Sequence, residues 1–383
     1  MSITRRVFLR NSALAAVGTA ALPSFLTRAA FGAADLGARA KRLVVIFQRG
    51  AADGLNIVVP HGEPSYYAMR PTINIPKKSV LDLDGFFGLH PSMSAFEPLW
   101  KQKHLAIVHA AGSPDPTRSH FDAQDFMESG RSGVEVTEHG WLNRALHERT
   151  ADKSAVDKSA FRAIALGHSL PRILLGKEPA VAVNGPGTGQ ETFDAVKMRK
   201  AADPAKYAPA AGANYPQGRF GDSLKQLAQL IKANLGVQVA FADMGGWDHH
   251  VNEGSTQGQL ANVLGDFSQS IAAFWTDLGN LGEDTVVVTM SEFGRTVREN
   301  GNRGTDHGHA NVMFVLGGPV KGGKVYGRWP GLDQSQLYQG RDLAMTTDFR
   351  LVLREAVSCC LGNRDLETVF PGFENQAGFM RYL

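Results

Sequence analysis

The sequence predicts an α/β fold with a mostly parallel sheet that helices flank on both faces. Apolar runs of the fully buried type, such as Leu43–Gln48 and Thr285–Met290, alternate along the chain with helical patterns. Strands that are separated by helices pair in parallel, and the helices then cover both faces of the sheet. The chain has 383 residues, 43% of them hydrophobic and 20% charged, which is ample for a well-buried core.

Each expected strand is a short, unbroken apolar run. These strands are Leu43–Gln48, Leu105–His109, Arg162–Leu166, Val237–Ala242, Thr285–Met290 and Val312–Leu316. The expected helices repeat apolar residues at helical spacing. These helices are Ser92–Lys101, Ser119–Ser129, Gly140–Glu148, Phe220–Leu235, Thr256–Leu278 and Phe349–Leu361. The segment Arg199–Gly218, rich in alanine, proline, glycine and tyrosine, is expected to be a surface insertion.

The first residues resemble a twin-arginine export signal. Thr4–Arg10 has the sequence Thr-Arg-Arg-Val-Phe-Leu-Arg, and the alanine-rich stretch Ala13–Leu26 follows it. Small residues after this stretch predict cleavage around residues 30–35. We expect residues 1–33 to be the signal peptide and residues 34–383 a single domain, which the twin-arginine machinery exports to the periplasm or the medium. The alternative is an uncleaved amphipathic helix.

The apolar stretch of the leader is interrupted by Pro23 and falls short of the about 20 apolar residues that a spanning helix needs. No second such stretch occurs, so we expect no membrane span in the mature protein. The chain has 40 basic and 37 acidic residues, and the leader contains four arginines and no acid. The rest is therefore close to neutral, which argues against a nucleic-acid partner.

The two cysteines of the chain, Cys359 and Cys360, are adjacent in the expected helix Phe349–Leu361. Neighbouring cysteines rarely meet the geometry of a disulfide. We therefore expect two buried, inert thiols rather than a redox pair.

Metal-binding residue types gather in the loops next to the expected strands. In sheets of this kind, functional residues collect at the carboxyl ends of the strands. Oxygen and nitrogen donors in such loops suit a divalent metal, namely zinc, manganese, magnesium or calcium. The expected donors are Asp53, Asp248, His250, Glu292, His307 and His309. The alternative is that they are turn and cap residues, or that they satisfy one another in a polar network.

Ser119 is expected at the start of a helix that follows the second strand. Backbone N–H groups and the positive end of the helix dipole favour an anionic group there, and a metal or a base could make Ser119 a nucleophile. The alternative is a helix cap, the commonest role of serine at such a position. Arg295, in the loop after Thr285–Met290, could clamp an anionic group in bidentate fashion.

Several motifs together resemble the domain of unknown function 1501 family, over roughly residues 40–380. These motifs are Arg49–Asn56, Arg118–Phe121, Gly245–Asp248, Ser291–Thr296 and Asp306–Gly308, together with the twin-arginine leader. The resemblance implies an alkaline phosphatase-like fold, shared with phosphatases and sulfatases. It also implies a divalent metal site made from the donors named above, with Ser119 as the nucleophile. Where that superfamily has an Asp-His pair, this chain has Glu292-Phe293, which removes one nitrogen ligand.

These observations predict an exported, metal-dependent hydrolase that acts on a phosphate or sulfate ester. The alternative is a non-catalytic exported binding or assembly protein that retains the fold with a degenerate site, and Phe293 favours it. An oxidoreductase is disfavoured, because no Gly-x-Gly-x-x-Gly opens a helix after the first strand and no cysteine spacing suits haem or iron–sulfur clusters.

Replacing both Arg5 and Arg6 with Lys is expected to leave the precursor in the cytoplasm, because the arginine pair is the signal that the export machinery recognises. Fractionation of cells and immunoblotting of each fraction measure this. Unchanged export of the double variant would remove the twin-arginine assignment.

Overall fold

The computed structural model describes residues 41–131, 139–147, 160–183, 203, 207–373 and 381–383. The expected signal peptide and its cleavage site lie outside the described residues, as does part of the expected insertion Arg199–Gly218. Residues Lys41–Leu383 make up one compact unit. Among the described residues, no helix is both long enough and apolar enough to cross a membrane.

Nine strands of the described chain form one mixed sheet in the order β11-β5-β10-β9-β1-β8-β6-β7, with β12 paired to β5. They are β1 (Arg42–Gln48), β5 (Leu105–Gly112), β6 (Ala163–Ala165), β7 (Val181–Ala182), β8 (Val239–Met244), β9 (Thr285–Met290), β10 (Asn311–Gly317), β11 (Lys324–Tyr326) and β12 (Thr347–Asp348). β10 runs antiparallel to β5 and β9. The other neighbouring pairs are parallel, which confirms the predicted mostly parallel sheet.

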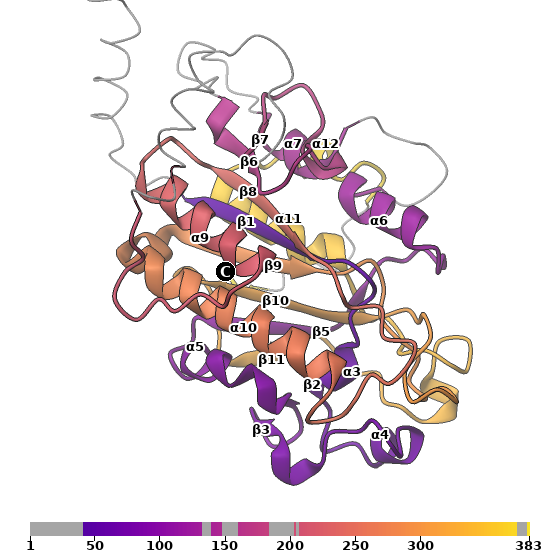
Figure 1. The fold of residues 1–383 in the computed structure, drawn as a ribbon. Coiled ribbons are helices and arrows are strands. Elements are labelled where there is room, and N and C mark those ends of the chain that lie inside the picture. The colour runs from indigo at the N-terminus through magenta and orange to yellow at the C-terminus, as the bar shows by residue number, and fades with distance from the viewer. Residues whose placement is uncertain (1–40, 132–138, 148–159, 184–202, 204–206, 374–380) are drawn as a thin grey trace, which may run out of the picture. The chain divides into compact units, whose positions relative to one another are not determined.

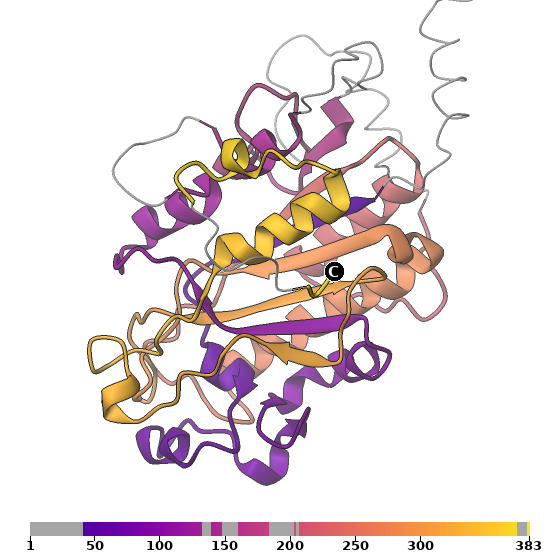
Figure 2. The same ribbon diagram turned by 180° about the vertical axis from the view of Figure 1, so that it is seen from behind.

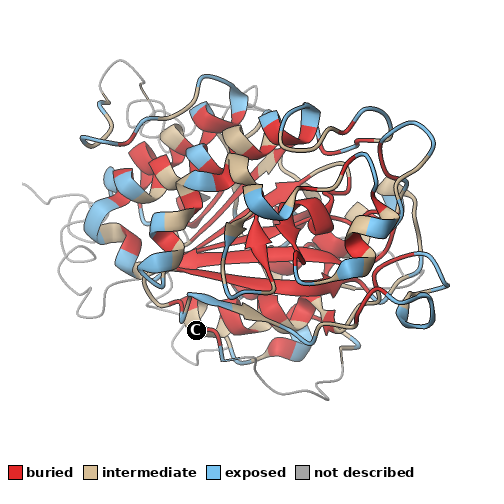
Figure 3. Cartoon of the chain, turned by 90° about the horizontal axis from the view of Figure 1, so that it is seen from below, coloured by how far each residue is buried: buried red, intermediate tan, exposed pale blue. Residues whose placement is uncertain are grey.

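The sheet is buried on both faces because its central strands are apolar on both sides. In β1, Val44 and Ile46 belong to a core cluster with residues of α9 (Arg219–Lys232) and α10 (Gln259–Leu278). Leu43, Val45 and Phe47 point to the other face and pack with α11 (Phe349–Leu361). Figure 1 shows α9 and α10 in front of the sheet, and Figure 2, seen from behind, shows the yellow helix α11 over the opposite face. Figure 3 shows the buried sheet between these two helical layers.

Shorter elements complete the two layers. α5 (Glu97–Lys101) packs on the α10 side, whereas α6 (His120–Ser129), α7 (Trp141–Ala145) and α12 (Leu366–Val369) pack on the α11 side. α3 (Gly54–Ile57), α4 (Pro64–Met69) and a small antiparallel sheet of β2 (Val58–Val59), β4 (Gly88–Leu89) and β3 (Leu81–Asp82) lie between β1 and β5 in the chain. The 3-10 helices are η1 (Lys77–Ser79), η2 (Pro91–Phe96), η3 (Ala160–Arg162), η4 (Arg172–Leu174), η6 (Gly279–Asp284) and η7 (Gln334–Gln336).

The expected elements agree with the structure except where local geometry interrupts them. β9 and α11 have the predicted bounds, and Asp348 caps α11 by accepting a hydrogen bond from the backbone N–H of Arg350 at 2.9 Å. The helix expected over Ser92–Lys101 divides into η2 and α5, because Met93 has non-helical backbone angles and Pro98 begins a new helix. Of the strands of two or three residues, β6 lies within the expected strand Arg162–Leu166, and the others were not predicted because so short a run has no periodicity.

Two expectations need correction. Cys360 is buried, as predicted, but Cys359 is half-buried and accepts a hydrogen bond from Nζ of Lys41 at 3.3 Å. Its bond with Cys360, together with Lys41, lowers the pKa of the Cys359 thiol to about 6, so the expected pair of buried thiols is not found. The described end of the expected insertion is also anchored, because the hydroxyls of Tyr207 and Tyr215 donate to Asp277 of α10.

Candidate metal centre

The candidate donors meet at the carboxyl edge of the central sheet. His120 is the first residue of α6, after β5, and Asp248 and His250 lie in the loop after β8. Glu292 follows β9, and His307 lies shortly before β10. Because β1, β5, β8 and β9 point one way and β10 points the other, these loops share one edge. α6, at the right in Figure 1, marks this edge.

Three imidazole rings and one carboxylate converge there. Nε2 of His307 lies 3.0 Å from Nε2 of His120 and 2.9 Å from Nε2 of His250. The carboxylate of Asp248 lies 3.0 Å from Nε2 of His250 and 3.5 Å from Nε2 of His307. It lies 3.7 Å from Nε2 of His120. We refer to these four residues as the His/Asp cluster; their side chains are 24–50% exposed, so solutes can reach them.

In two of these rings, the hydrogen bond of Nδ1 determines which ring nitrogen carries the hydrogen. Nδ1 of His120 lies 2.8 Å from Oε1 of Glu292, and Nδ1 of His307 lies 3.0 Å from the carbonyl oxygen of Arg118. A carboxylate or carbonyl oxygen only accepts, so both Nδ1 atoms carry the hydrogen and both Nε2 atoms of the neutral rings present lone pairs. Two lone pairs 3.0 Å apart repel each other unless a proton or a cation lies between them.

The separations in the His/Asp cluster fit one metal ion. Two ligand atoms bound at about 2.0–2.1 Å to a tetrahedral zinc ion lie about 3.4 Å apart. The five separations given above run from 2.9 to 3.7 Å, on both sides of that value. Nδ1 of His250 faces Asp306 at 3.4 Å, so all three rings turn Nε2 inward and Nδ1 toward an oxygen. Histidine ligands of metals are typically held in this way.

Glu292 lies behind His120 rather than among the inward-facing groups. Its carboxylate also accepts hydrogen bonds from the backbone N–H of Gly50 at 2.9 Å and from Gln124 at 3.0 Å. Burial alone would raise the pKa of Glu292, but these bonds, with that from His120 the strongest, hold it below its ordinary value. The same bond raises the pKa of His120. An ionised Glu292 thus orients His120 instead of supplying a ligand itself.

Arg295 holds the loops of the site together. Its buried guanidinium donates from Nε to the carbonyl of Ala51 at 2.6 Å and from Nη1 to that of Thr305 at 3.1 Å. Nη2 donates to Asp248 at 2.5 Å and to two further carbonyls, those of Gly50 and Trp247. All three nitrogens therefore already donate to protein acceptors. This corrects the predicted bidentate clamp on a substrate anion, since Arg295 orients Asp248 and not an external group.

Two glycines allow the loops after β9 and before β10 to pair. The N–H of Gly294 donates to the carbonyl of His309, and the N–H of Gly308 donates to that of Gly294, both at 2.8 Å. A Cβ on Gly294 would lie 1.9 Å from the carbonyl oxygen of Ala310, and one on Gly308 would lie 2.3 Å from the backbone of Arg295. This pairing brings His307 beside Arg295.

Asp53 lies outside the His/Asp cluster. Its carboxylate forms a buried ion pair with Arg70, whose Nη2 donates to Oδ1 at 3.0 Å. Burial would raise the pKa of Asp53, but Arg70 lowers it below its ordinary value. The neighbouring Glu253 has a pKa well above its usual range because it is buried and faces Asp53. Asp53 is thus already neutralised by a cation of the protein, which leaves little reason for a metal there.

The remaining predicted residues lie at the rim. The ring of His309 stacks on Tyr338 with 4.1 Å between centroids and is not among the inward-facing groups. Ser119 caps α6, since its hydroxyl accepts from the N–H of Asp122 at 3.5 Å. The bond between His307 and the carbonyl of Arg118 ties this helix start to the cluster. The position of Ser119 is consistent with both of its expected roles.

Sequence reasoning missed His120 as a candidate donor. The Arg118–Phe121 motif contains His120, but the residue of this motif that was expected to act was Ser119, as a nucleophile. His120, Asp248 and His307 form a group whose ligand atoms all lie within 4.8 Å of one another. Phe293, which stands where a nitrogen ligand was expected, packs its ring against His120 and His307 at 5.0 Å each.

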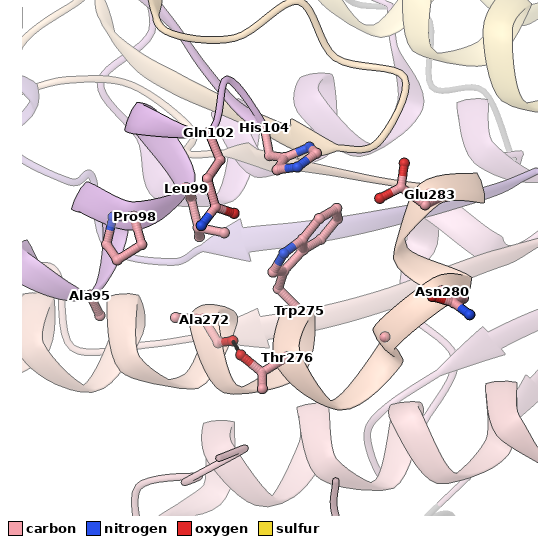
Figure 4. Close-up of a pocket in the computed structure, with 11 residues that line it drawn as sticks. Ala95, Pro98, Leu99, Gln102, His104, Ala272, Trp275, Thr276, Asn280 and Glu283 are labelled. Atoms are coloured by element: carbon pink, nitrogen blue, oxygen red, sulfur yellow. Dashed lines mark hydrogen bonds between the residues drawn. The ribbon is translucent and has the colours of Figure 1, made fainter. Parts of the chain in front are cut away.

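A separate cavity of about 440 Å³ lies away from this site. It is lined by residues near the amino ends of β5 and β9, including His104 and Glu283. Figure 4 shows Trp275 of α10 in this cavity, and its ring centroid lies 4.8 Å from that of His104. The cavity includes no residue of the His/Asp cluster.

Arg295→Lys is expected to lower the free energy of unfolding by about 3 kcal/mol or more. A single ammonium cannot reach the carbonyls and the carboxylate that the guanidinium holds, and each buried acceptor left without a donor costs about 1–3 kcal/mol. Urea denaturation measures the change. Arg298→Lys, at an exposed neighbouring position, is the control and should change stability by less than about 0.5 kcal/mol. Equal stability of the two variants would contradict the role given to Arg295.

Solved structures with partial likeness to this chain include a periplasmic domain, a putative sulfatase and a phosphonate monoester hydrolase. The C-terminal periplasmic domain of EptC from Escherichia coli, in complex with Zn, is 9% identical with a TM-score of 0.38, and the match covers 74% of each chain. A putative sulfatase from Bacteroides thetaiotaomicron is 11% identical with a TM-score of 0.40, over 88% of this chain and 76% of the other. A phosphonate monoester hydrolase from Agrobacterium radiobacter is 11% identical with a TM-score of 0.34, over 88% and 78%.

No curated protein matches the chain. The model of the family described as "Protein of unknown function (DUF1501)" matches residues 177–356. The resemblance noted from the sequence is based on several motifs, and this range contains three of them, Gly245–Asp248, Ser291–Thr296 and Asp306–Gly308. Residues 177–356, which include three loops of the site, are therefore similar to the family described as Protein of unknown function (DUF1501).

Proposed function

We propose that the His/Asp cluster holds one divalent metal ion and that the chain is an exported hydrolase of a phosphate or sulfate ester. One observation carries the metal assignment. Nε2 of His307 lies 2.9–3.0 Å from Nε2 of His120 and of His250, and the carboxylate of Asp248 lies 3.0–3.7 Å from all three rings. Nδ1 of each ring faces an oxygen acceptor. Nitrogen and oxygen donors at this spacing suit zinc best among the metals considered.

The competing explanation is a polar network in which one shared proton replaces the metal. A proton between His120 and His307 would relieve the repulsion of one pair of lone pairs, but His250 also turns Nε2 toward His307 at 2.9 Å. If one proton lies between His120 and His307, Nε2 of His250 still faces either a lone pair or a hydrogen on Nε2 of His307. A single cation interacts favourably with all three nitrogens and with Asp248 at once.

The residues of the chain have separable tasks in such a reaction. A bound divalent metal would polarise an ester oxygen and lower the pKa of a hydroxyl or water beside it. Glu292 orients His120, and Arg295 orients Asp248. Ser119 lies at the N-terminus of α6, where free backbone N–H groups favour a phosphate or sulfate group, and its hydroxyl is the candidate nucleophile.

A non-catalytic binding protein is the second candidate, and Phe293 favours it. Its buried ring packs against His120 and His307, so an apolar group stands where a further nitrogen donor was expected. A single metal site that lacks a partner site could bind an anion without hydrolysing an ester. Assays of metal content and of turnover distinguish the two candidates.

We further propose that the mature chain works in the periplasm or outside the cell. The support is the Thr4–Arg10 motif of the leader, in which Arg5 and Arg6 stand in the context of the export signal.

His307→Ala is expected to weaken zinc binding roughly 100-fold or more, because His307 contacts both other imidazoles of the cluster; losing a partner outside the ligand set already costs about 10- to 100-fold. Elemental analysis after dialysis against zinc, followed by a chelator competition, measures this. His147→Ala is the matched control, since His147 is an exposed histidine paired with Glu178. Zinc binding that is unchanged in His307→Ala, or absent from the unaltered protein, contradicts the metal site.

Ser119→Ala is expected to keep the zinc content and to abolish turnover of 4-nitrophenyl phosphate and 4-nitrophenyl sulfate. The loss of the cap should cost about 1 kcal/mol of stability. Ser119→Asn keeps a capping side chain but has no hydroxyl, so it should be stable and equally inactive. If Ser119→Asn hydrolyses the ester, the serine is only a cap. If the unaltered, zinc-loaded protein turns over neither ester, the non-catalytic candidate is correct.

A further inference from the structure

Two of the most exposed large apolar side chains on the described surface directly follow histidines of the His/Asp cluster. Phe121 is 90% exposed and follows His120, and Val251 is 50% exposed and follows His250. In the described residues, the other large apolar side chain of this kind is Leu175. An isolated exposed apolar residue needs no explanation, but two that flank one candidate site do.

Both side chains are held in these positions by regular backbone interactions. Phe121 lies in the first turn of α6, which Ser119 caps. The backbone of Val251 is fixed because its carbonyl accepts from Gln259 at 2.9 Å, while the carbonyl of His250 accepts from Asn300 at 2.9 Å. Consecutive Cα atoms are about 3.8 Å apart, so each apolar side chain begins one residue from a cluster imidazole.

A charged group is also present at this rim. Arg341 has a side chain that is 46% exposed; it donates to Asp342 at 2.9 Å and also to the carbonyl oxygen of His307. The mouth of the site thus combines a half-exposed guanidinium with apolar side chains next to the inward-facing imidazoles. This combination matches a ligand with an anionic group and an apolar group close together.

The area favours a small apolar group over a protein partner. A phenylalanine side chain buries about 150–250 Å² when it is fully covered. A stable protein interface covers about 800 Å² on each partner. Phe121 and Val251 together are too small for such an interface, but they are large enough to cover one side of an aromatic ring or a short acyl group.

We propose that the ester bound by the His/Asp cluster carries an aryl or acyl group next to its phosphate or sulfate, and that Phe121 and Val251 contact this group. The proposal rests on the proposed function and names its substrate class. Contact with Phe121 and Val251 favours such esters because covering apolar surface on both partners removes it from water. The metal-site residues bind the anionic group and do not distinguish the apolar part.

The test uses the zinc-loaded full chain and ligand pairs that cannot be hydrolysed and differ only in the apolar group. Phenylphosphonate is compared with methylphosphonate, and benzenesulfonate with methanesulfonate, by calorimetric titration. The pair that binds distinguishes a phosphate from a sulfate. We expect the phenyl ligand of that pair to bind about tenfold more tightly than the methyl ligand.

Phe121→Ser and Val251→Ser should each reduce the ratio of the two affinities, and Phe121→Ser should bring it close to one. Leu175→Ser, at an exposed apolar position outside the rim, is the control and should keep the ratio. Both rim positions are exposed, so these variants are expected to fold; Val251→Ser provides a second test if Phe121→Ser does not.

The outcomes distinguish a failure of the proposed anion-binding metal site from a failure of the proposed contact with an aryl or acyl group. If none of the four ligands binds, the proposed function fails, and with it this inference. If methyl and phenyl ligands bind equally, or if both rim variants keep the wild-type ratio, the anion site stands and this inference is overturned. If the protein sediments with phosphatidylcholine vesicles and Phe121→Ser abolishes this while the phenyl preference is absent, the rim contacts a membrane surface instead of a substrate.

Discussion

The buried guanidinium of Arg295 ties the loops at the carboxyl edge of the sheet into one unit. It lies after β9 and donates to carbonyls of the loops that follow β1 and β8 and of the loop that precedes β10, and it also donates to Asp248. Hydrogen bonds of a charged donor to buried acceptors contribute about 1.5–3 kcal/mol each. Without this guanidinium, Asp248 would lose its side-chain link to the loops after β1 and before β10. The geometry of the candidate metal centre therefore depends on Arg295.

The fold could be predicted from the sequence to the extent that its strands are apolar and buried on both faces. β9 has the predicted bounds, and β1, β8 and β10 differ from prediction by one or two residues at an end. Parallel strands place their carboxyl ends at one edge, so residues as distant in the chain as Asp248 and Glu292, which follow β8 and β9, could be expected near each other. His307 joins them because β10 runs antiparallel to its neighbours. The short strands β7, β11 and β12 carry no such pattern, because they exist only where a neighbouring strand pairs with them.

The division of tasks within the site could not be predicted in the same way. Glu292, Asp53 and Arg295 are of the right residue types for a metal or anion site, but the sequence does not show which residues they contact in the fold. Glu292 orients His120, and Arg70, far from any motif, neutralises Asp53. Both outcomes depend on tertiary contacts, namely Glu292 with α6 and Asp53 with the end of α4. Spacing in the chain indicates which residues lie at one edge of the sheet. Ion pairs and hydrogen bonds, which the sequence does not show, determine which of them are available to bind a metal.

The His/Asp cluster is unfavourable for the stability of the fold, and this argues for a function. Because Nδ1 of His120 and of His307 each bind an oxygen acceptor, the lone pairs on their Nε2 atoms face each other at 3.0 Å. Nε2 of His250 lies 2.9 Å from Nε2 of His307. Buried polar groups in folded proteins are nearly always paired with complementary ones, so a set of converging acceptors is rare. Such conflicts persist chiefly at functional sites, where a ligand resolves them. The side chains of the cluster are partly exposed and the loops are fixed by Arg295, so a proton or a cation from solution can relieve this repulsion.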